Sequence, residues 1–268
     1  MVGLPSSDTM PLNQARLAGA AESCLPLKLD EIHVWRCRIS SGGDAVRSGT
    51  VLLSPQERSR VLRFRFEADA MRYTRSRICL RHLLALYTGT SAASVVLNEA
   101  PSGKPFMEDD ECPSPIRFSL SHSGDALVLA FALGQEVGVD VEARTSCVDV
   151  LSLAACFLPH SETKRLGALD IDARRAAFFT HWVRREAVLK VAGLGVAKMP
   201  MVSVNRSAPV VQKLDRWEAD CAGTGYTGWD LDTTEASPGA LAVRTSSRDI
   251  RIIQRSTTDR YAGWMRPA

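Results

Sequence analysis

The sequence lacks several features that would assign it to a class of protein at once. It has no apolar run long enough to span a bilayer, and no cationic start followed by an apolar segment, so we expect no secretory signal. Its 7 cysteines are an odd number without a Cys-x-x-Cys pair, which argues against a disulfide framework and a zinc ribbon. A reducing, cytoplasmic compartment fits such a chain best.

Neither the overall charge nor the composition is extreme. Of 268 residues, 45% are hydrophobic and 24% are charged, and the formal net charge is +3. These values exclude disordered and fibrous classes and allow one large core or two modest ones. Eight arginines nevertheless fall between Arg58 and Arg81. Such a stretch is ordinarily a solvated helical face, but it would also suit phosphate or an acidic protein partner.

The first half of the chain predicts one strand and two helices. Residues 29–38 alternate as a strand does. Residues 54–57 read Ser-Pro-Gln-Glu, a capping box with proline at the first helical position. After a break near Glu67, a second helix is expected to run to about Tyr87 and to stop before Gly89.

Strands dominate the middle of the chain. Residues 118–123 alternate between apolar and small polar types, and residues 126–133 have no polar face, so we expect a strand covered on both sides. Gly134-Gln135 is a tight turn. Residues 136–142 are then predicted to return as the partner strand of a hairpin.

The second half predicts helices followed by strands. One helix is expected near Ser161, a longer one from an Asp172 cap to a Gly193 stop, and strands follow between residues 200 and 255. The fold class is therefore α+β. The expected organisation is a loosely ordered leader (1–28), an N-terminal half (29–142), a C-terminal half (143–255) and a tail (256–268).

Two acidic residues share one face of the strand at residues 137–142. The three valines take one face, which leaves Gly138, Asp140 and Glu142 on the other, predicted to be the solvent side. Such a pair is most often an exposed polar surface. Carboxylate oxygens are also the hard ligands that Mg²⁺ needs, with substrate phosphate and water completing its octahedron.

Three residues of the long second-half helix are spaced by four. Trp182, Glu186 and Lys190 lie along one stripe of that helix. The plain explanation is an i,i+4 salt bridge beside a core tryptophan. The functional alternative directs Glu186 to a metal and Lys190 to a phosphate.

Two further basic side chains suit phosphate. His122, between Ser121 and Ser123, is either a structural histidine or a phosphate donor. Lys104, fixed by Pro105, is either an exposed lysine or a phosphate ligand.

The order and spacing of four blocks carry more information than any block alone. They are Gly-Lys-Pro (103–105), Phe-Ser-Leu-Ser-His-Ser (118–123), Gly-Val-Asp-Val-Glu (138–142) and Trp-Val-Arg-Arg-Glu-Ala-Val-Leu-Lys (182–190). Together they resemble the Sfp-like 4′-phosphopantetheinyl transferases, over about residues 50–205.

The resemblance implies a monomer of two similar halves related by a pseudo-twofold, with coenzyme A in the cleft between them. Its activity would be the Mg²⁺-dependent transfer of 4′-phosphopantetheine from coenzyme A to a serine of an apo acyl or peptidyl carrier protein, with release of 3′,5′-ADP. Mn²⁺ accepts similar ligands. Neither nucleic acid nor a membrane is implied as a partner, and the carrier and its pathway stay open.

The resemblance also assigns roles by position. Asp140, Glu142 and Glu186 would bind the metal, and Lys190 would contact the phosphates. Either Glu186 or a water that it orients would be the base for the acceptor serine.

The remaining assignments concern the nucleotide. His122, with Lys104 and Ser121 near it, would hold the coenzyme A phosphates, the 3′-phosphate especially. Arg60 and Arg77 match basic positions that face the nucleotide in the family.

The chain departs from the family pattern at two positions, and two other functions stay open. Val183 stands where Ser or Thr is usual, and Arg185 where Lys is usual. One alternative is a nucleic-acid-binding module built on the arginine-rich helices, although they lack interleaved aromatic residues. The other is a Mg²⁺-dependent pyrophosphatase that acts on coenzyme A or a nucleotide, with water as acceptor.

Overall fold

The structure is a computed structural model that describes residues 24–39, 50–107, 115–145, 148–205, 214–234, 237–245 and 249–256. Most of the expected leader, residues 108–114 and the expected tail from residue 257 lie outside these residues. None of the helices in the described ranges is long and apolar enough to cross a membrane.

Two sheets form the centre of the molecule. The first has the strand order β11 (Arg251–Ser256), β1 (Glu31–Arg38), β5 (Ala126–Leu133), β4 (Ile116–Ser123). The second has the order β6 (Val137–Val141), β10 (Ser237–Arg244), β9 (Thr224–Thr234), β8 (Arg216–Cys221), β7 (Val202–Asn205). A small hairpin joins β2 (Leu97–Glu99) to β3 (Pro105–Met107). Only the β1–β11 pair is parallel among the strands described.

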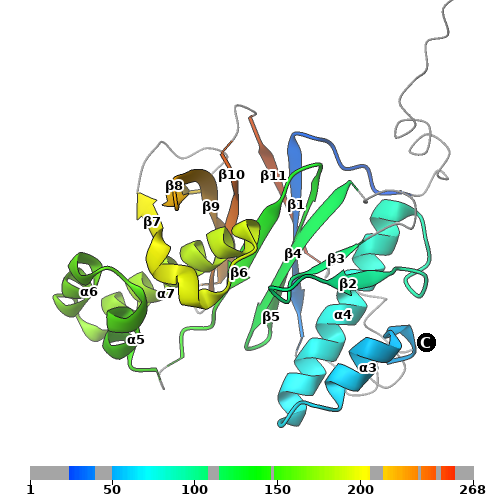
Figure 1. Ribbon diagram of the computed structural model, residues 1–268, viewed down its shortest axis with the longest axis horizontal. Coiled ribbons are helices and arrows are strands. Elements are labelled where there is room, and N and C mark those ends of the chain that lie inside the picture. The colour runs from blue at the N-terminus through cyan, green and yellow to red at the C-terminus, as the bar shows by residue number, and fades with distance from the viewer. Residues whose placement is uncertain are drawn as a thin grey trace, which may run out of the picture.

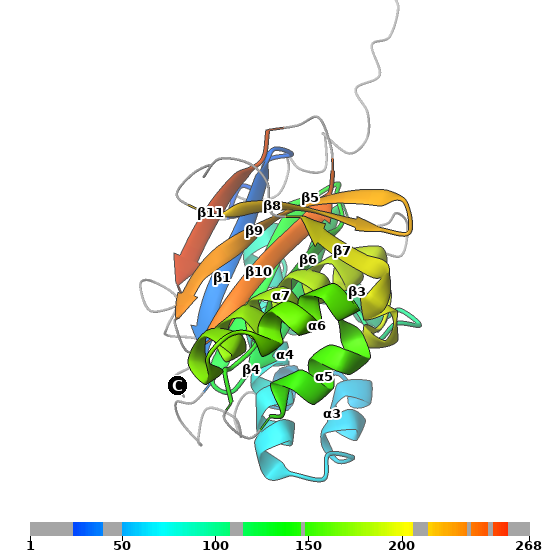
Figure 2. The same ribbon diagram turned by 90° about the vertical axis from the view of Figure 1, so that its left-hand side faces the viewer.

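Helices cover the outer faces of both sheets. On the first sheet lies α4 (Glu67–Thr88), and the 3₁₀ turn η1 (Thr50–Leu52) and α3 (Pro55–Val61) pack against α4. On the second lies α7 (Ile171–Ala192), followed by η2 (Val196–Met201), and α5 (Val150–Phe157) and α6 (His160–Gly167) pack against α7. Figure 1 shows α4 and α7 on opposite sides of the paired sheets, and Figure 2 shows α5, α6 and α7 grouped together.

The strand β5 shows why this layering is stable. Its alternate residues Val128, Ala130 and Ala132 pack toward the second sheet, in one core cluster with the valines of β6. Leu129 and Phe131 pack on the other face, with α4. The prediction of a strand covered on both sides is confirmed.

The hairpin predicted for β5 and β6 is wrong. The turn at Gly134 is present, with φ 70°, but β6 pairs with β10 in the second sheet. The physical reason is that both edges of β5 are already occupied, by β1 and β4. The chain therefore crosses from one sheet to the other at this turn.

Helix ends follow the local signals closely. The capping box of Ser54 and Glu57 is present, and both long helices end at a glycine in the left-handed region, Gly89 and Gly193. The cap of α7 is a correction, because Asp170 and not Asp172 accepts the first backbone N–H groups. The sequence analysis did not predict α5.

The sheets do not follow the expected division of the chain strictly. β6 lies before residue 142 but belongs to the second sheet, and β11 returns near the end of the chain to the first. The mixed α+β class is nevertheless observed.

Candidate active site

The polar face of β6 is buried against α7 and does not face solvent. A Cβ on Gly138 would lie 2.0 Å from the carbonyl oxygen of Ala187, so only glycine lets the helix backbone come this close. Asp140, on the same face, is 3% exposed. The alternation of valines and polar residues was predicted correctly, but the solvent side was wrong, because alternation does not reveal what covers a face.

One hydroxyl donor and one ammonium donor meet at Asp140. Its Oδ1 accepts from the hydroxyl of Ser121 at 2.7 Å and from Nζ of Lys190 at 2.8 Å. Its Oδ2 is buried and has no hydrogen-bond partner. An unpaired buried carboxylate oxygen is costly, and it is a suitable ligand for a cation.

Glu142 and Glu186 complete a group of three carboxylates. Glu142 accepts from the hydroxyl of Ser123 at 2.7 Å, and burial, with Asp140 nearby, raises its pKa. Burial raises the pKa of Glu186 to about 7, and the charges of Asp140 and Glu142 add to the effect. The three acids are therefore close enough to repel one another.

The oxygen chemistry of this group suits Mg²⁺, but in the described residues its side chains are not arranged as a coordination shell. Within the described ranges, no cluster of three or more His, Cys, Asp or Glu side chains is arranged so that it could hold a metal ion. The carboxylate oxygens, the unpaired Oδ2 of Asp140 and the repulsion felt by Glu186 are what a hard divalent cation would satisfy.

Both lysines assigned to phosphate have three acceptors within the protein. Lys190 donates to Asp140, to the carbonyl of Val139 at 3.0 Å and to that of Leu120 at 3.5 Å. Lys104 donates to Glu136 at 2.8 Å and, at 3.1 Å each, to the carbonyls of Val137 and Lys190. An ammonium has three protons, so each lysine has an acceptor for every proton. Because some of these bonds join residues before position 142 to Lys190, both lysines link the two halves.

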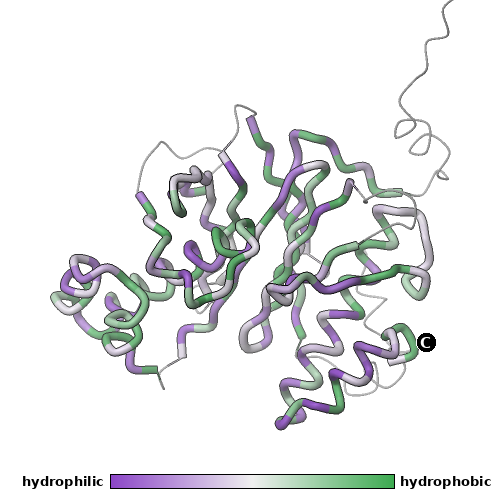
Figure 3. Tube along the Cα trace, in the orientation of Figure 1, coloured by the Kyte–Doolittle hydropathy of each residue, from purple (hydrophilic) through white to green (hydrophobic). Residues whose placement is uncertain are grey.

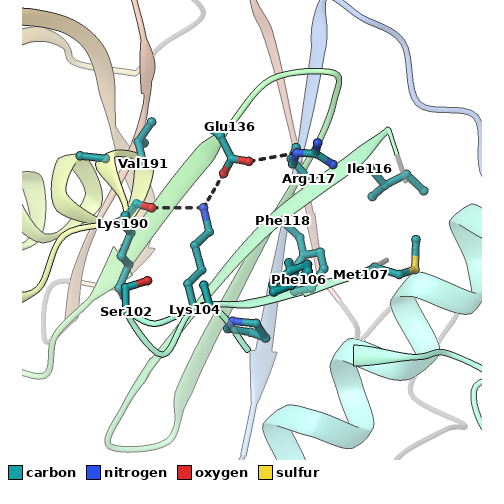
Figure 4. A pocket seen from close by; sticks show the side chains of 14 residues that line it. Ser102, Lys104, Phe106, Met107, Ile116, Arg117, Phe118, Glu136, Lys190 and Val191 are labelled. Carbon is teal, nitrogen blue, oxygen red and sulfur yellow. Dashed lines mark hydrogen bonds and ion pairs between the residues drawn. The ribbon is translucent and has the colours of Figure 1, made fainter. Parts of the chain in front are cut away.

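Figure 4 shows the surroundings of Lys104. Its side chain extends between the β3 strand and the end of α7, where Glu136 also binds Arg117 at 3.0 Å. The side chain of Lys104 is 18% exposed. The Gly-Lys-Pro block therefore fastens its own loop to the start of β6.

A neighbouring pocket of about 310 Å³ brings together most of the sequence-predicted residues. The lining residues relevant here are Arg60, Arg77, Lys104, His122, Glu186 and Lys190. Burial lowers the pKa of His122, and the positive charges of Lys190 and Arg72 contribute. A pocket with this many cationic and N–H groups suits an anionic ligand.

Tyr73, which was not among the residues predicted from the sequence, lies beside two arginines of this pocket. The guanidinium groups of Arg60 and Arg77 lie 5.3 and 5.0 Å from the centre of its ring. Arg60 also pairs with Glu99, and Arg77 faces Glu57 at 3.9 Å. The i,i+4 spacing of Tyr73 and Arg77 was the available signal.

The two departures from the family pattern have structural explanations. Val183 lies on the face of α7 that packs on the second sheet, in an apolar core cluster where an apolar side chain packs well. Arg185 is fully buried and donates to Glu162 at 2.6 Å and to the carbonyl of Val202 at 3.1 Å. A lysine would carry the charge but would not reproduce this forked set of donors.

Comparison with known proteins identifies the family. Residues 44–133 match the family model "4′-phosphopantetheinyl transferase, N-terminal", and residues 136–221 match "4′-phosphopantetheinyl transferase superfamily". The chain belongs to the 4′-phosphopantetheinyl transferase superfamily, whose members are transferases.

Three relatives illustrate the range of similarity. The 4′-phosphopantetheinyl transferase HetI of Nostoc sp. is 31% identical over 180 residues, which cover 67% of this chain and 76% of the relative. A phosphopantetheinyl transferase of Thraustochytrium sp. is 32% identical over 179 residues, 62% of each chain. The L-aminoadipate-semialdehyde dehydrogenase-phosphopantetheinyl transferase of Xenopus laevis is 28% identical over 153 residues, 54% of this chain and 50% of the relative.

Proposed function

We propose that this protein transfers the 4′-phosphopantetheine group of coenzyme A to a serine of an apo carrier protein and releases 3′,5′-ADP. The observation that carries the proposal is the group of three carboxylates, Asp140, Glu142 and Glu186, beside a pocket rich in cationic side chains that Glu186 and Lys190 also line. This combination supplies metal ligands and cationic groups that can bind phosphate at one place.

The residues of the group divide the chemistry among them. Asp140, Glu142 and Glu186 would hold Mg²⁺ or Mn²⁺, which would neutralise the charge of the pyrophosphate when bound. The hydroxyl of the acceptor serine attacks the β-phosphate in line, and the bond to the ADP oxygen breaks. The proton of the serine hydroxyl passes to Glu186, directly or through a water that Glu186 orients. Lys190 already donates to three acceptors, so it would stabilise the charge that develops on the phosphates through its positive charge and not through a direct hydrogen bond.

The nucleotide is assigned to the side of the pocket formed by the first half. His122 would contact the 3′-phosphate, and Arg60 and Arg77 would face the nucleotide. Ser121 and Lys104 belong near the phosphates, but their hydroxyl and ammonium groups already bond to Asp140 and to Glu136. In this proposal they position the site.

The two halves, 29–142 and 143–255 with the strand exchanges described above, would be related by a pseudo-twofold, with coenzyme A between them. The support is a repeated contact. In each half a buried arginine of the long helix binds a glutamate of a preceding short helix, Arg81 with Glu57 and Arg185 with Glu162. A monomer in the cytoplasm remains the prediction from sequence.

One incubation tests the activity. The protein is mixed with coenzyme A and Mg²⁺, with and without a panel of apo carrier proteins from fatty-acid, polyketide, nonribosomal peptide and lysine pathways. Intact-protein mass spectrometry should show phosphopantetheine on at least one carrier, dependent on the metal. Release of 3′,5′-ADP at the same rate without any carrier would instead identify a pyrophosphatase.

A further inference from the structure

Three serines of β4 form a row of hydroxyls against β6. Ser119, Ser121 and Ser123 are alternate residues and so lie on one face of their strand. We call them the serine ladder. Its contacts, in order, are Val139 N–H to Ser119 Oγ at 3.1 Å, Ser121 Oγ to Asp140 Oδ1 at 2.7 Å, and Ser123 Oγ to Glu142 Oε2 at 2.7 Å.

The ladder crosses the junction between the two sheets. β4 is an edge strand of the first sheet and β6 is an edge strand of the second. The contacts of Ser119 and Ser121 are shielded from solvent, since these residues are 3% and 8% exposed. A buried hydroxyl that donates to a carboxylate forms a strong, charge-assisted hydrogen bond.

The hydroxyl directions are fixed by further bonds. Ser123 accepts from the backbone N–H of Ala143 at 3.0 Å, which leaves its own proton for Glu142. Ser121 shares the Oδ1 of Asp140 with Lys190, so the opposite oxygen, Oδ2, is left without a partner. Each serine thus holds one oxygen of a carboxylate, and at Asp140 the other oxygen is left without a partner.

We propose that Ser121 and Ser123 are positioning residues that hold Asp140 and Glu142 for the divalent metal. The inference rests on the proposed function for the identity of the metal site. The torsion about the bond to a carboxylate group has a broad, roughly two-fold preference and no sharp minimum. A hydrogen bond to one oxygen therefore determines where the other oxygen points. Groups that orient metal ligands in this way commonly contribute tenfold or more to metal affinity.

The arrangement also makes the metal site a property of the sheet junction. The carboxylates are carried by the second sheet, but the hydroxyls that orient them come from the first. A displacement of β4 against β6 would therefore weaken metal binding without touching a ligand.

The test measures metal affinity and not turnover. Ser121→Ala and Ser123→Ala are compared with wild type by titrating Mn²⁺ in the presence of coenzyme A, with free Mn²⁺ read by electron paramagnetic resonance. We expect the dissociation constant for Mn²⁺ to rise about tenfold to a hundredfold in each variant. Ser121→Thr keeps the hydroxyl and should bind Mn²⁺ nearly as wild type does.

Ser119→Ala is the matched control, because its hydroxyl contacts a backbone N–H and no carboxylate. It should lower the melting temperature and leave Mn²⁺ affinity within about twofold of wild type, since it removes no group that orients a ligand. If Ser121→Ala fails to fold, Ser123→Ala at its half-buried position provides the same readout.

Unchanged Mn²⁺ affinity in Ser121→Ala and Ser123→Ala, or an equal loss in Ser119→Ala, would overturn the inference. The serine ladder would then only stabilise the contact between β4 and β6. A wild-type protein that binds no Mn²⁺ with coenzyme A present would overturn the inference as well. If Mn²⁺ binds and the serines control its affinity but no apo carrier is modified, the proposed function fails and the ladder stands.

Discussion

The two long helices of this protein are built alike and present different side chains to one pocket. α4 and α7 each have 22 residues and end at a left-handed glycine. Each carries a buried arginine seven residues before its last residue, Arg81 in α4 and Arg185 in α7. Figure 3 shows that hydrophilic residues occur along both helices among the hydrophobic ones.

The two arginines make equivalent contacts. Arg81 binds Glu57 of α3 at 2.8 Å and the carbonyl of Val95 at 2.7 Å. Arg185 binds Glu162 of α6 and the carbonyl of Val202, as described above. In both halves a buried ion pair therefore joins a short helix, the long helix and the segment that follows it.

The difference lies in what each helix presents to the pocket. α4 presents Tyr73 and Arg77, groups that suit an anionic nucleotide, whereas α7 presents Glu186 and Lys190, groups that suit proton transfer and phosphate charge. The comparison teaches that one scaffold contact can be kept in both halves while the residues facing the pocket differ, in the proposed function for nucleotide binding in the first half and for chemistry in the second.

The largest expected effect separates chemistry from binding. Glu186→Gln keeps the size of the side chain but removes its charge and basicity, so kcat should fall by about two to four powers of ten. Coenzyme A should still bind when Mg²⁺ is raised. Single-turnover transfer to an apo carrier measures this, with the exposed Glu67→Gln of α4 as control. Wild-type turnover at saturating Mg²⁺ would make Glu186 a surface carboxylate and no more.

The second prediction tests whether the two buried arginines are equivalent. Arg185→Met and Arg81→Met each leave a glutamate without its buried arginine partner, which should cost about 3–5 kcal/mol of unfolding free energy. We expect the larger loss for Arg185→Met, because Glu57 keeps Arg77 at 3.9 Å whereas Glu162 keeps only His181, at 3.6 Å, among the ion pairs found in the described ranges.

Urea denaturation measures both losses, and Arg185→Lys should fall between wild type and Arg185→Met because it restores charge without the fork. Losses below about 1 kcal/mol, as for exposed ion pairs, would show that the arginines do not act as buried clamps.

The third prediction uses pH to separate the two halves. In the first, burial and then the charge of Arg255 lower the pKa of His33 from 6.5 to about 4. The unfolded chain therefore binds a proton that the folded protein does not, and stability is lost as the pH falls from about 6.5 to about 4. In the second, the pKa of Glu186 is raised from 4.5 to about 7. There stability is lost as the pH rises through that interval.

Each shift corresponds to about 3 kcal/mol at most. The two intervals overlap between about pH 4.5 and 6.5, so the two effects oppose one another there and the wild-type stability should change little. In urea denaturation of the metal-free protein from pH 4 to 8, Glu186→Gln should expose the loss of stability toward acid that His33 causes, and His33→Asn should expose the loss toward higher pH that Glu186 causes. Variants whose stability changes with pH as little as that of wild type would contradict the assignment.

The smallest expected effect concerns binding by the first half. Arg60→Ala should weaken coenzyme A binding about tenfold, since a hydrogen bond to a charged group contributes about 1.5–3 kcal/mol. kcat at saturating coenzyme A should change little, the reverse of the pattern for Glu186→Gln. Isothermal titration calorimetry and steady-state kinetics measure the two quantities, with the exposed Arg63→Ala as control. An equal loss in Arg63→Ala would mean that the effect is general electrostatics.

The sequence by itself determined the features that depend on near neighbours. The capping box at Ser54, the stops at Gly89 and Gly193, and the alternation of valines with Gly138 and Asp140 along β6 were all readable, because hydrogen bonds and side-chain periodicity within a few residues control them. The order of the four blocks likewise identified the family, which the comparisons confirm.

Only the tertiary structure decided which partners these elements meet. The pairing of β6 with β10 depended on the edges of β5 being occupied, and the burial of Asp140 depended on α7 packing over Gly138. The three acceptors of Lys104 and the contacts of the serine ladder join residues from 19 to 86 positions apart in the chain. Alternation along a strand states which side chains share a face, but the groups that cover that face come from distant segments, and only folding brings them together.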